Sequence, residues 1–192
     1  GFDPESLSSS GRSTSTYEVQ LASAEGTDLG LLLDAEDEKV CLVKGIAEDS
    51  LVQKWNLKNQ DGKIVKIYHR LISVDGKPGT SSTFIGELKV RSTPVSLVFE
   101  RPLVLRVAVN KDEQPDLLGI VMVPTEKDLR IDRVQEGLIQ QWNSLASAER
   151  RLKSSDRIIS VNRHQGSGQE LMKAIESSSL LDIRVVSWQA QP

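Results

Sequence analysis

Two short segments of this 192-residue chain occur twice, and both recur at the same distance. Residues 51–56 read LVQKWN, and residues 138–143, 87 positions further along, read LIQQWN. Residues 71–75 read LISVD, and residues 158–162, again 87 positions later, read IISVN. Two independent segments that share one offset indicate an internal duplication, which constrains the fold more than any other feature of the sequence.

The duplication divides the chain into two modules of similar length. A third match, LGL at 29–31 against LGI at 118–120, has an offset of 89, so the loop that follows differs by two residues. The predicted modules are residues 17–102 and 103–192, placed back to back with almost no linker. Residues 1–16 are rich in Ser and Thr and poor in apolar side chains, so we expect a disordered linker there.

Each module is predicted to be rich in strands, with two short helices. Apolar and polar residues alternate in the outer strands of the first module, and its inner strands are short apolar runs. Ser50 precedes apolar residues at helical spacing, so it is the expected N-cap of the first helix. The expected strands are 17–21, 29–33, 40–46, 71–74 and 95–99, and the expected helices are 50–56 and 82–90. The second module repeats this order and ends with a strand at 181–185.

The order of these elements, together with two motifs, resembles the PDZ family. The Leu-Gly-Leu and Leu-Gly-Ile segments look like the second half of that family's Gly-Leu-Gly-Phe loop. Residues 153–162, KSSDRIISVN, are similar to its Val-Gly-Asp-Arg-Ile-Leu-x-Val-Asn segment, and His69 replaces the Asp of that motif in the first module. The resemblance covers nearly all of both modules. It implies an α+β, β-dominated fold of two PDZ-like, partly open β-barrels or sandwiches, each with about five to six strands and two helices.

This resemblance implies a peptide-binding groove between the second strand and the second helix of each module. Gly30 and Gly119 are expected to let the backbone turn and to present N–H groups to a terminal carboxylate. Alternation along the second strand places one set of side chains on one face, Leu29, Leu31 and Leu33 in the first module and Leu118, Ile120 and Met122 in the second. The family register adds Ile85 and Leu88, and Met172 and Ile175, from the helices. An alternative reading is that Leu33 and Met122 only fill the core.

Residues beyond the pockets also bear on selectivity. The first position of the second helix, which in the family reads the ligand two residues before its end, falls at Ser81 and Gly168, and neither is the His that would select Ser or Thr. Two acids, Glu25 and Asp28, stand in the loop before Gly30, where their like charge would oppose a carboxylate in the first groove. Lys111 stands near the second groove, which is therefore expected to be the better carboxylate binder.

Composition argues against other functions. Net charge is −3 and the Lys and Arg residues are scattered, so nucleic acid is not an expected partner. No transmembrane segment, metal site or cofactor is expected, the single Cys41 is expected to be buried in a strand, and a cytoplasmic location is favoured. Since His69 and His164 are the only histidines and both lie at expected turns, we assign them surface roles and predict no enzyme activity.

The sequence therefore predicts a non-catalytic scaffold or adaptor that binds protein C-termini or extended peptides. Because the expected pockets are aliphatic, the ligand's terminal residue should be Val, Leu or Ile. Two alternatives remain open. The pair of modules could be the regulatory region of a larger enzyme, a protease or a signalling enzyme. The grooves could also be degenerate and serve self-association.

Overall fold

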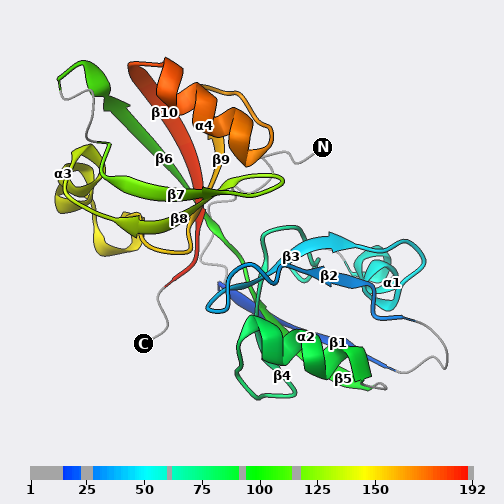
Figure 1. Cartoon of the computed structure of the whole chain (residues 1–192). Coiled ribbons are helices and arrows are strands. Elements are labelled where there is room, and N and C mark those ends of the chain that lie inside the picture. The colour runs from blue at the N-terminus through cyan, green and yellow to red at the C-terminus, as the bar shows by residue number, and fades with distance from the viewer. Residues whose placement is uncertain (1–14, 23–27, 60–61, 91–93, 114–117, 190–192) are drawn as a thin grey trace. The chain divides into compact units, whose positions relative to one another are not determined.

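The computed structural model describes residues 15–22, 28–59, 62–90, 94–113 and 118–189. These residues form two compact units, the first ending at Pro102 and the second beginning at Leu103 (Figure 1). Most of the tract expected to be a disordered linker, residues 1–16, lies outside the described residues.

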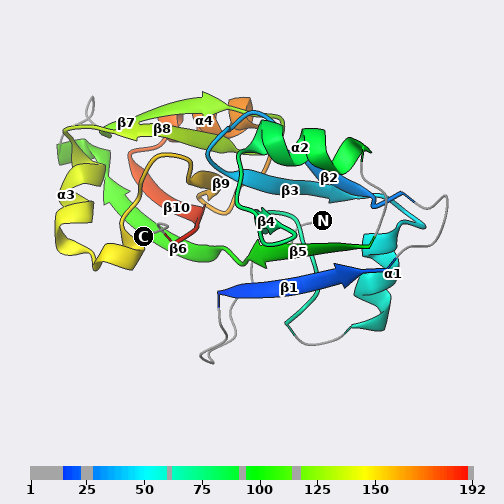
Figure 2. The same cartoon turned by 90° about the horizontal axis from the view of Figure 1, so that it is seen from below.

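The first unit is an antiparallel sheet of five strands in the order β1-β5-β4-β3-β2. In chain order its elements are β1 (Thr16–Leu21), β2 (Leu31–Leu33), β3 (Cys41–Ile46), α1 (Leu51–Lys58), β4 (Arg70–Val74), α2 (Ser81–Val90) and β5 (Val95–Glu100). Strands β1 and β2 are the two edges of the sheet. Helix α2 lies beside β2 and β3, as Figure 2 shows.

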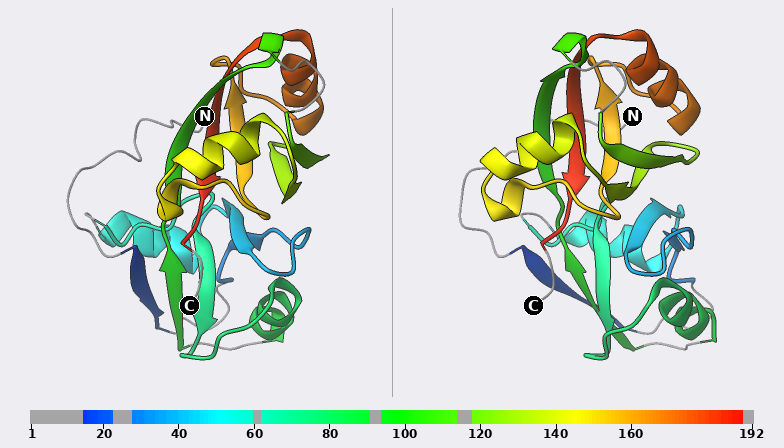
Figure 3. Two further views of the ribbon diagram at one scale, coloured as in Figure 1. Left: turned by 90° about the vertical axis from the view of Figure 1, so that its left-hand side faces the viewer. Right: turned by 60° about the vertical axis from the view of Figure 1, so that its left-hand side comes forward.

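The second unit repeats this arrangement with strand order β6-β10-β9-β8-β7. Its elements are β6 (Leu103–Asn110), β7 (Ile120–Pro124), β8 (Leu129–Val134), α3 (Leu138–Leu145), β9 (Arg157–Val161), α4 (Gly168–Ser177) and β10 (Leu180–Ser187), with short 3-10 turns at Lys111–Glu113 and Ala148–Arg150. Helix α4 packs against β7, β8 and β9 (Figure 3). The predicted fold class, β-dominated α+β in two similar modules, is confirmed.

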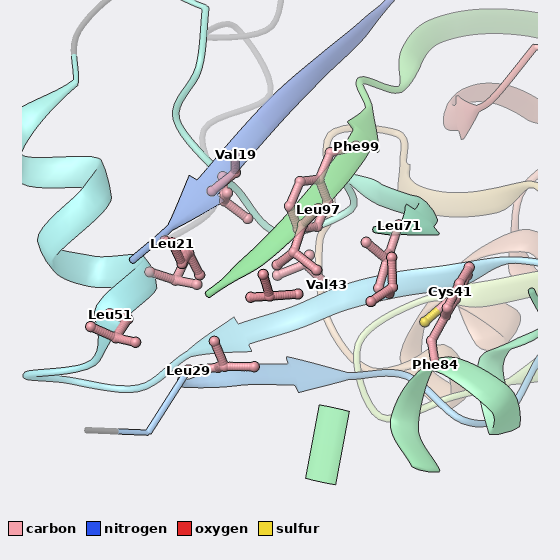
Figure 4. Close-up of a cluster of buried hydrophobic side chains, with 14 of the residues drawn as sticks. Val19, Leu21, Leu29, Cys41, Val43, Leu51, Leu71, Phe84, Leu97 and Phe99 are labelled. Carbon is pink, nitrogen blue, oxygen red and sulfur yellow. The ribbon is translucent and has the colours of Figure 1, made fainter. Parts of the chain in front are cut away.

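Aliphatic side chains fill both cores, as the scarcity of aromatic residues requires. In the first unit the alternation along β1 and β5 turns Val19, Leu97 and Phe99 inward, and none of the three is exposed. Figure 4 shows Leu71 of the neighbouring strand β4 on the same side of the sheet, and Phe84 of α2 next to Cys41. The prediction that Cys41 is buried in a strand is also confirmed.

The repeated Trp-Asn segment holds the loop after the first helix of each unit. The side-chain amide of Asn56 donates to the carbonyl of Val65 at 2.8 Å, and its oxygen accepts the Val65 N–H at 2.9 Å. Asn143 makes the same pair of hydrogen bonds with Leu152, both at 2.8 Å. Because each asparagine satisfies one backbone donor and one backbone acceptor, its repetition is explained by the fold.

The second repeated segment, LISVD at 71–75 and IISVN at 158–162, ends on a residue whose side chain is hydrogen-bonded to the last strand of its unit. The Asp75 carboxylate accepts the Ser96 N–H, and the Asn162 side-chain oxygen accepts the Asp182 N–H, both at 2.8 Å. Asp75 and Asn162 both have positive φ, as the tight turns there require.

His69 is buried, so the surface role expected for it is wrong, whereas His164 is exposed. The expectation failed because His69 precedes β4 and turns inward rather than into the solvent. Its Nδ1 shares a hydrogen bond with the Tyr17 hydroxyl, which also donates to the carbonyl of Ile64. Burial, with help from the nearby Arg101 and Lys66, lowers the pKa of His69 to about 3.

Serine side chains cap the first turn of two helices, α1 and α4. Ser50 is the N-cap of α1, as predicted, and its Oγ accepts the Gln53 N–H at 3.2 Å. Ser167 and Glu170 form a reciprocal capping box at the start of α4.

Within the described residues, no helix is long and apolar enough to cross a membrane.

Candidate functional site

An apolar groove lies between edge strand β2 and helix α2 of the first unit. Its volume is about 550 Å³, and its lining consists of Asp28, Leu29, Leu31, Leu32, Leu33, Ala35, Ile85, Leu88 and Lys89. Because β2 pairs with β3 on one side and ends the sheet on the other, its outer edge faces the groove. An edge strand beside an apolar groove can accept a further strand.

The structure brings together five residues predicted for this groove, Leu29, Leu31, Leu33, Ile85 and Leu88. Leu31, Leu33 and Leu88 are half-buried and also pack against the core, so they serve both the groove and the fold. Leu29 is buried at 8% exposure and belongs mostly to the core. Sequence reasoning placed Asp28 beside the groove but missed Leu32, Ala35 and Lys89, because alternation alone assigns Leu32 to the opposite face.

Gly30 lies at the end of the groove in a loop that is fastened to the start of α1. Its φ of +75° is in the left-handed region, and its carbonyl accepts the Ala47 N–H at 2.8 Å. The carbonyls of Asp28 and Leu29 accept the N–H groups of Leu51 and Val52, both at 3.1 Å. The N–H of Gly30 donates to Oδ1 of Asp28 at 3.3 Å.

Ser81, predicted to read the ligand from the first position of α2, is buried at 1% exposure against the loop between β2 and β3. Its Oγ donates to the carbonyl of Asp37 and its N–H donates to the carbonyl of Glu38 at 3.2 Å. The Glu38 carboxylate also accepts the Ser82 N–H at 3.0 Å. Ser81 therefore holds the far end of the groove and does not line it.

The second unit places its predicted residues in the equivalent elements. Leu118, Ile120, Met122 and Met172 are half-buried and pack against the core, while Ile175 is buried. Gly119 has a φ of +78°, and its carbonyl accepts the Gln135 N–H at 2.9 Å, which repeats the fastening seen at Gly30. The glycines that precede β2 and β7 therefore have the same conformation and equivalent hydrogen bonds.

Gly168, the counterpart of Ser81, likewise joins the start of the second helix to the loop between the second and third strands of its unit. Its N–H donates to the carbonyl of Thr125 at 2.9 Å, 87 positions after the acceptor used by Ser81. A Cβ on Gly168 would lie 2.6 Å from the Cα of Pro124 and from the N of Thr125, and closer still to the carbonyl oxygen of Asp128. The start of α4 therefore touches the end of β7 through backbone atoms.

This contact predicts opposite effects of two Gly→Ala substitutions in helices. In Gly168→Ala the overpacking should outweigh the gain in helix propensity, so the second unit should lose about 1 kcal/mol of unfolding free energy. Gly86→Ala in α2, where an added Cβ meets nothing within 4 Å, should stabilise the first unit by up to about 1 kcal/mol. Urea unfolding followed by the amide signals of each unit measures both, and equal effects would contradict the backbone contact.

Lys111, expected near a second groove, is hydrogen-bonded to the end of helix α4. Its Nζ donates to the carbonyl of Ile175 at 2.6 Å and to that of Glu176 at 3.4 Å. A cation at the last turn of α4 satisfies carbonyls that lack partners within the helix. Asp116, in the adjoining loop, lies outside the described residues. Among the described residues, no group of three His, Cys, Asp or Glu side chains could hold a metal ion.

No family model and no curated protein matches the chain. Among solved structures it is similar to INAD PDZ45 in complex with NORPA CC-PBM, with 16% identity and a TM-score of 0.41 over 91% of this chain and 92% of that one. INAD PDZ45 in complex with NG2 peptide is similar at 16% identity and a TM-score of 0.39, over 91% and 89%. The Dlg1 PDZ2 of the choanoflagellate Monosiga brevicollis gives 21% and 0.36, over 45% and 98%. All three are PDZ structures.

Proposed function

We propose that each unit binds an extended peptide segment as an additional strand and catalyses no reaction. The proposed sites are the outer edges of β2 and β7, each beside the second helix of its unit. The observation that carries the proposal is the aliphatic groove of about 550 Å³ along β2, which opens beside the unpaired edge of a sheet. Main-chain hydrogen bonds to that edge supply affinity, and the apolar lining supplies selectivity.

The proposed ligand is a chain end or an extended segment that carries Val, Leu or Ile. Such a side chain can fill the space between Leu31 and Leu33 of the strand and Ile85 and Leu88 of the helix. A charged side chain there would be desolvated without a partner, which costs more than the strand pairing returns. In the second unit, Ile120 and Met172 occupy the corresponding places.

Charge placed in either groove is expected to weaken binding. In the first unit Ile85→Glu should weaken a Val-containing peptide at least about tenfold, because the carboxylate occupies the apolar groove. Leu57→Glu is the matched control, since Leu57 is 78% exposed on α1 and outside the groove. Shifts of the β2 amide signals during titration of the full chain measure affinity. Unchanged affinity of Ile85→Glu would rule out this groove.

The second unit allows the same comparison with Met172→Glu and its control Leu145→Glu, at 91% exposure on α3. Each peptide is titrated with a free and with an amidated terminus. Loss of binding on amidation identifies chain ends as ligands, and indifference identifies internal segments. If no peptide from a library with varied termini shifts β2 or β7, sedimentation of the full chain tests self-association instead.

A further inference from the structure

The first groove already holds a carboxylate of its own chain at its loop end. Asp28 lines the groove, and its Oδ1 accepts the hydrogen bond of the Gly30 N–H at 3.3 Å. The backbone of Asp28 is fixed as well, since its carbonyl accepts the Leu51 N–H at 3.1 Å. An amide that a terminal carboxylate would need is therefore occupied by an acid that stays exposed to the ligand side.

Among the described residues that line the groove, Asp28 and Lys89 are charged and the others are apolar. Glu25 lies outside the described residues. The hydrogen bond from the Gly30 N–H holds the Asp28 carboxylate beside the place where the ligand strand would bind. Lys89 is exposed in the last turn of α2, on a flexible stem where solvent screens its charge. The ligand group that arrives beside Gly30 therefore faces a fixed negative charge.

We propose that the first unit binds an internal extended segment, in which a basic residue follows the aliphatic residue and pairs with Asp28. This inference rests on the proposed function and names the ligand class of one of its two sites. A terminal carboxylate would lose the Gly30 amide and meet a like charge at short range, whereas Lys or Arg at that point gains a charge-assisted hydrogen bond. The described part of β2 spans three residues, Leu31–Leu33, so the ligand leaves the strand edge close to Asp28.

The test uses the full chain and four acetylated peptides with one shared segment up to Val. The first ends at Val with a free carboxylate, and the second ends there as an amide. The third continues past Val with Lys and neutral residues to an amide, and the fourth has Glu in place of that Lys. Chemical shifts of the Gly30 and Leu31 amides report binding to the first unit alone.

The third peptide is expected to bind the tightest, and about tenfold more tightly than the fourth. Asp28→Asn keeps an oxygen for the Gly30 N–H but removes the charge, so it should reduce this ratio to nearly one. Asp34→Asn is the matched control, because Asp34 accepts a similar hydrogen bond from the Glu36 N–H at 2.9 Å but lies outside the groove lining. It should leave the ratio unchanged.

Two results would overturn the inference while leaving the proposed function intact. One is tightest binding of the free-carboxylate peptide, especially if Lys89→Gln then weakens it, since Lys89 would be the partner of the carboxylate. The other is a ratio between the Lys and Glu peptides that Asp28→Asn leaves unchanged. If none of the four peptides shifts Gly30 or Leu31, the proposed function of this unit fails as well.

Discussion

Replacing Gly30 with Ala is expected to lower the free energy of unfolding of the first unit by about 3 kcal/mol. Two effects add at this position. The φ of +75° is unfavourable for any residue with a Cβ, and that Cβ would overlap the Cβ and Oγ of Ser50. Ser50 is the N-cap of α1 and also donates to the carbonyl of Ala47 at 2.7 Å. The substitution therefore disturbs a helix start as well as a loop.

Gly76→Ala separates the two effects. Gly76 has a nearly equal φ of +73°, but an added Cβ there meets nothing within 4 Å. Only the conformational penalty remains, so the loss should be about 1 kcal/mol. Urea unfolding followed by the amide signals of β1 and β5 gives both values on the same unit. Equal losses in the two variants would mean that the contact with Ser50 yields without strain and that φ alone requires glycine at position 30.

The fold could be predicted largely because the repeated residues are those that hold it. Asn56 and Asn143 each make the same two hydrogen bonds to the backbone nine residues further on. Such residues tolerate few replacements, so the duplication remained visible in the sequence. For the same reason the repeated segments report on the fold and carry no information about ligands.

The candidate site was only partly predictable. Leu31 and Leu33, which alternation assigns to the groove, line it, but so does Leu32, which alternation assigns to the opposite face. The burial of Ser81 depends on the carbonyl of Asp37 in a loop about 44 residues away, which a local pattern cannot register. Asp28 was visible as a nearby acid, but its hydrogen bond to Gly30 follows from the loop conformation.

The environment of the residue directly before β4, and of its counterpart directly before β9, also could not be predicted from local sequence patterns. Asp156 occupies it in the second unit, where it accepts the Lys153 N–H at 2.9 Å and is buried. His69 occupies it in the first unit and makes a different contact, with Tyr17 of β1. A turn residue on the surface was expected only for His69, and both side chains are buried. Their opposite chemistry makes the two units respond differently to acid.

Acid is expected to destabilise the first unit through His69. Burial lowers its pKa from 6.5 to about 3, so the folded state binds fewer protons than the unfolded state between these values. Stability from the neutral ring is therefore complete above pH 6.5 and is lost as pH falls toward 3, by up to about 1.4 kcal/mol per pH unit. Below pH 6.5 the unfolding free energy of this unit should fall by several kcal/mol in total.

In the second unit, the Asp156 carboxyl should act in the opposite direction. Burial raises the pKa of this carboxyl, so the folded state binds a proton more readily than the unfolded state, and this group favours folding as pH falls. Urea unfolding at pH 7, 5.5 and 4, read from the amide signals of each unit, compares the two. His69→Asn removes the titrating ring and should flatten the pH dependence of the first unit. If the wild-type ring takes up its proton near pH 6 while the unit is folded, the buried neutral histidine is not the source of acid sensitivity.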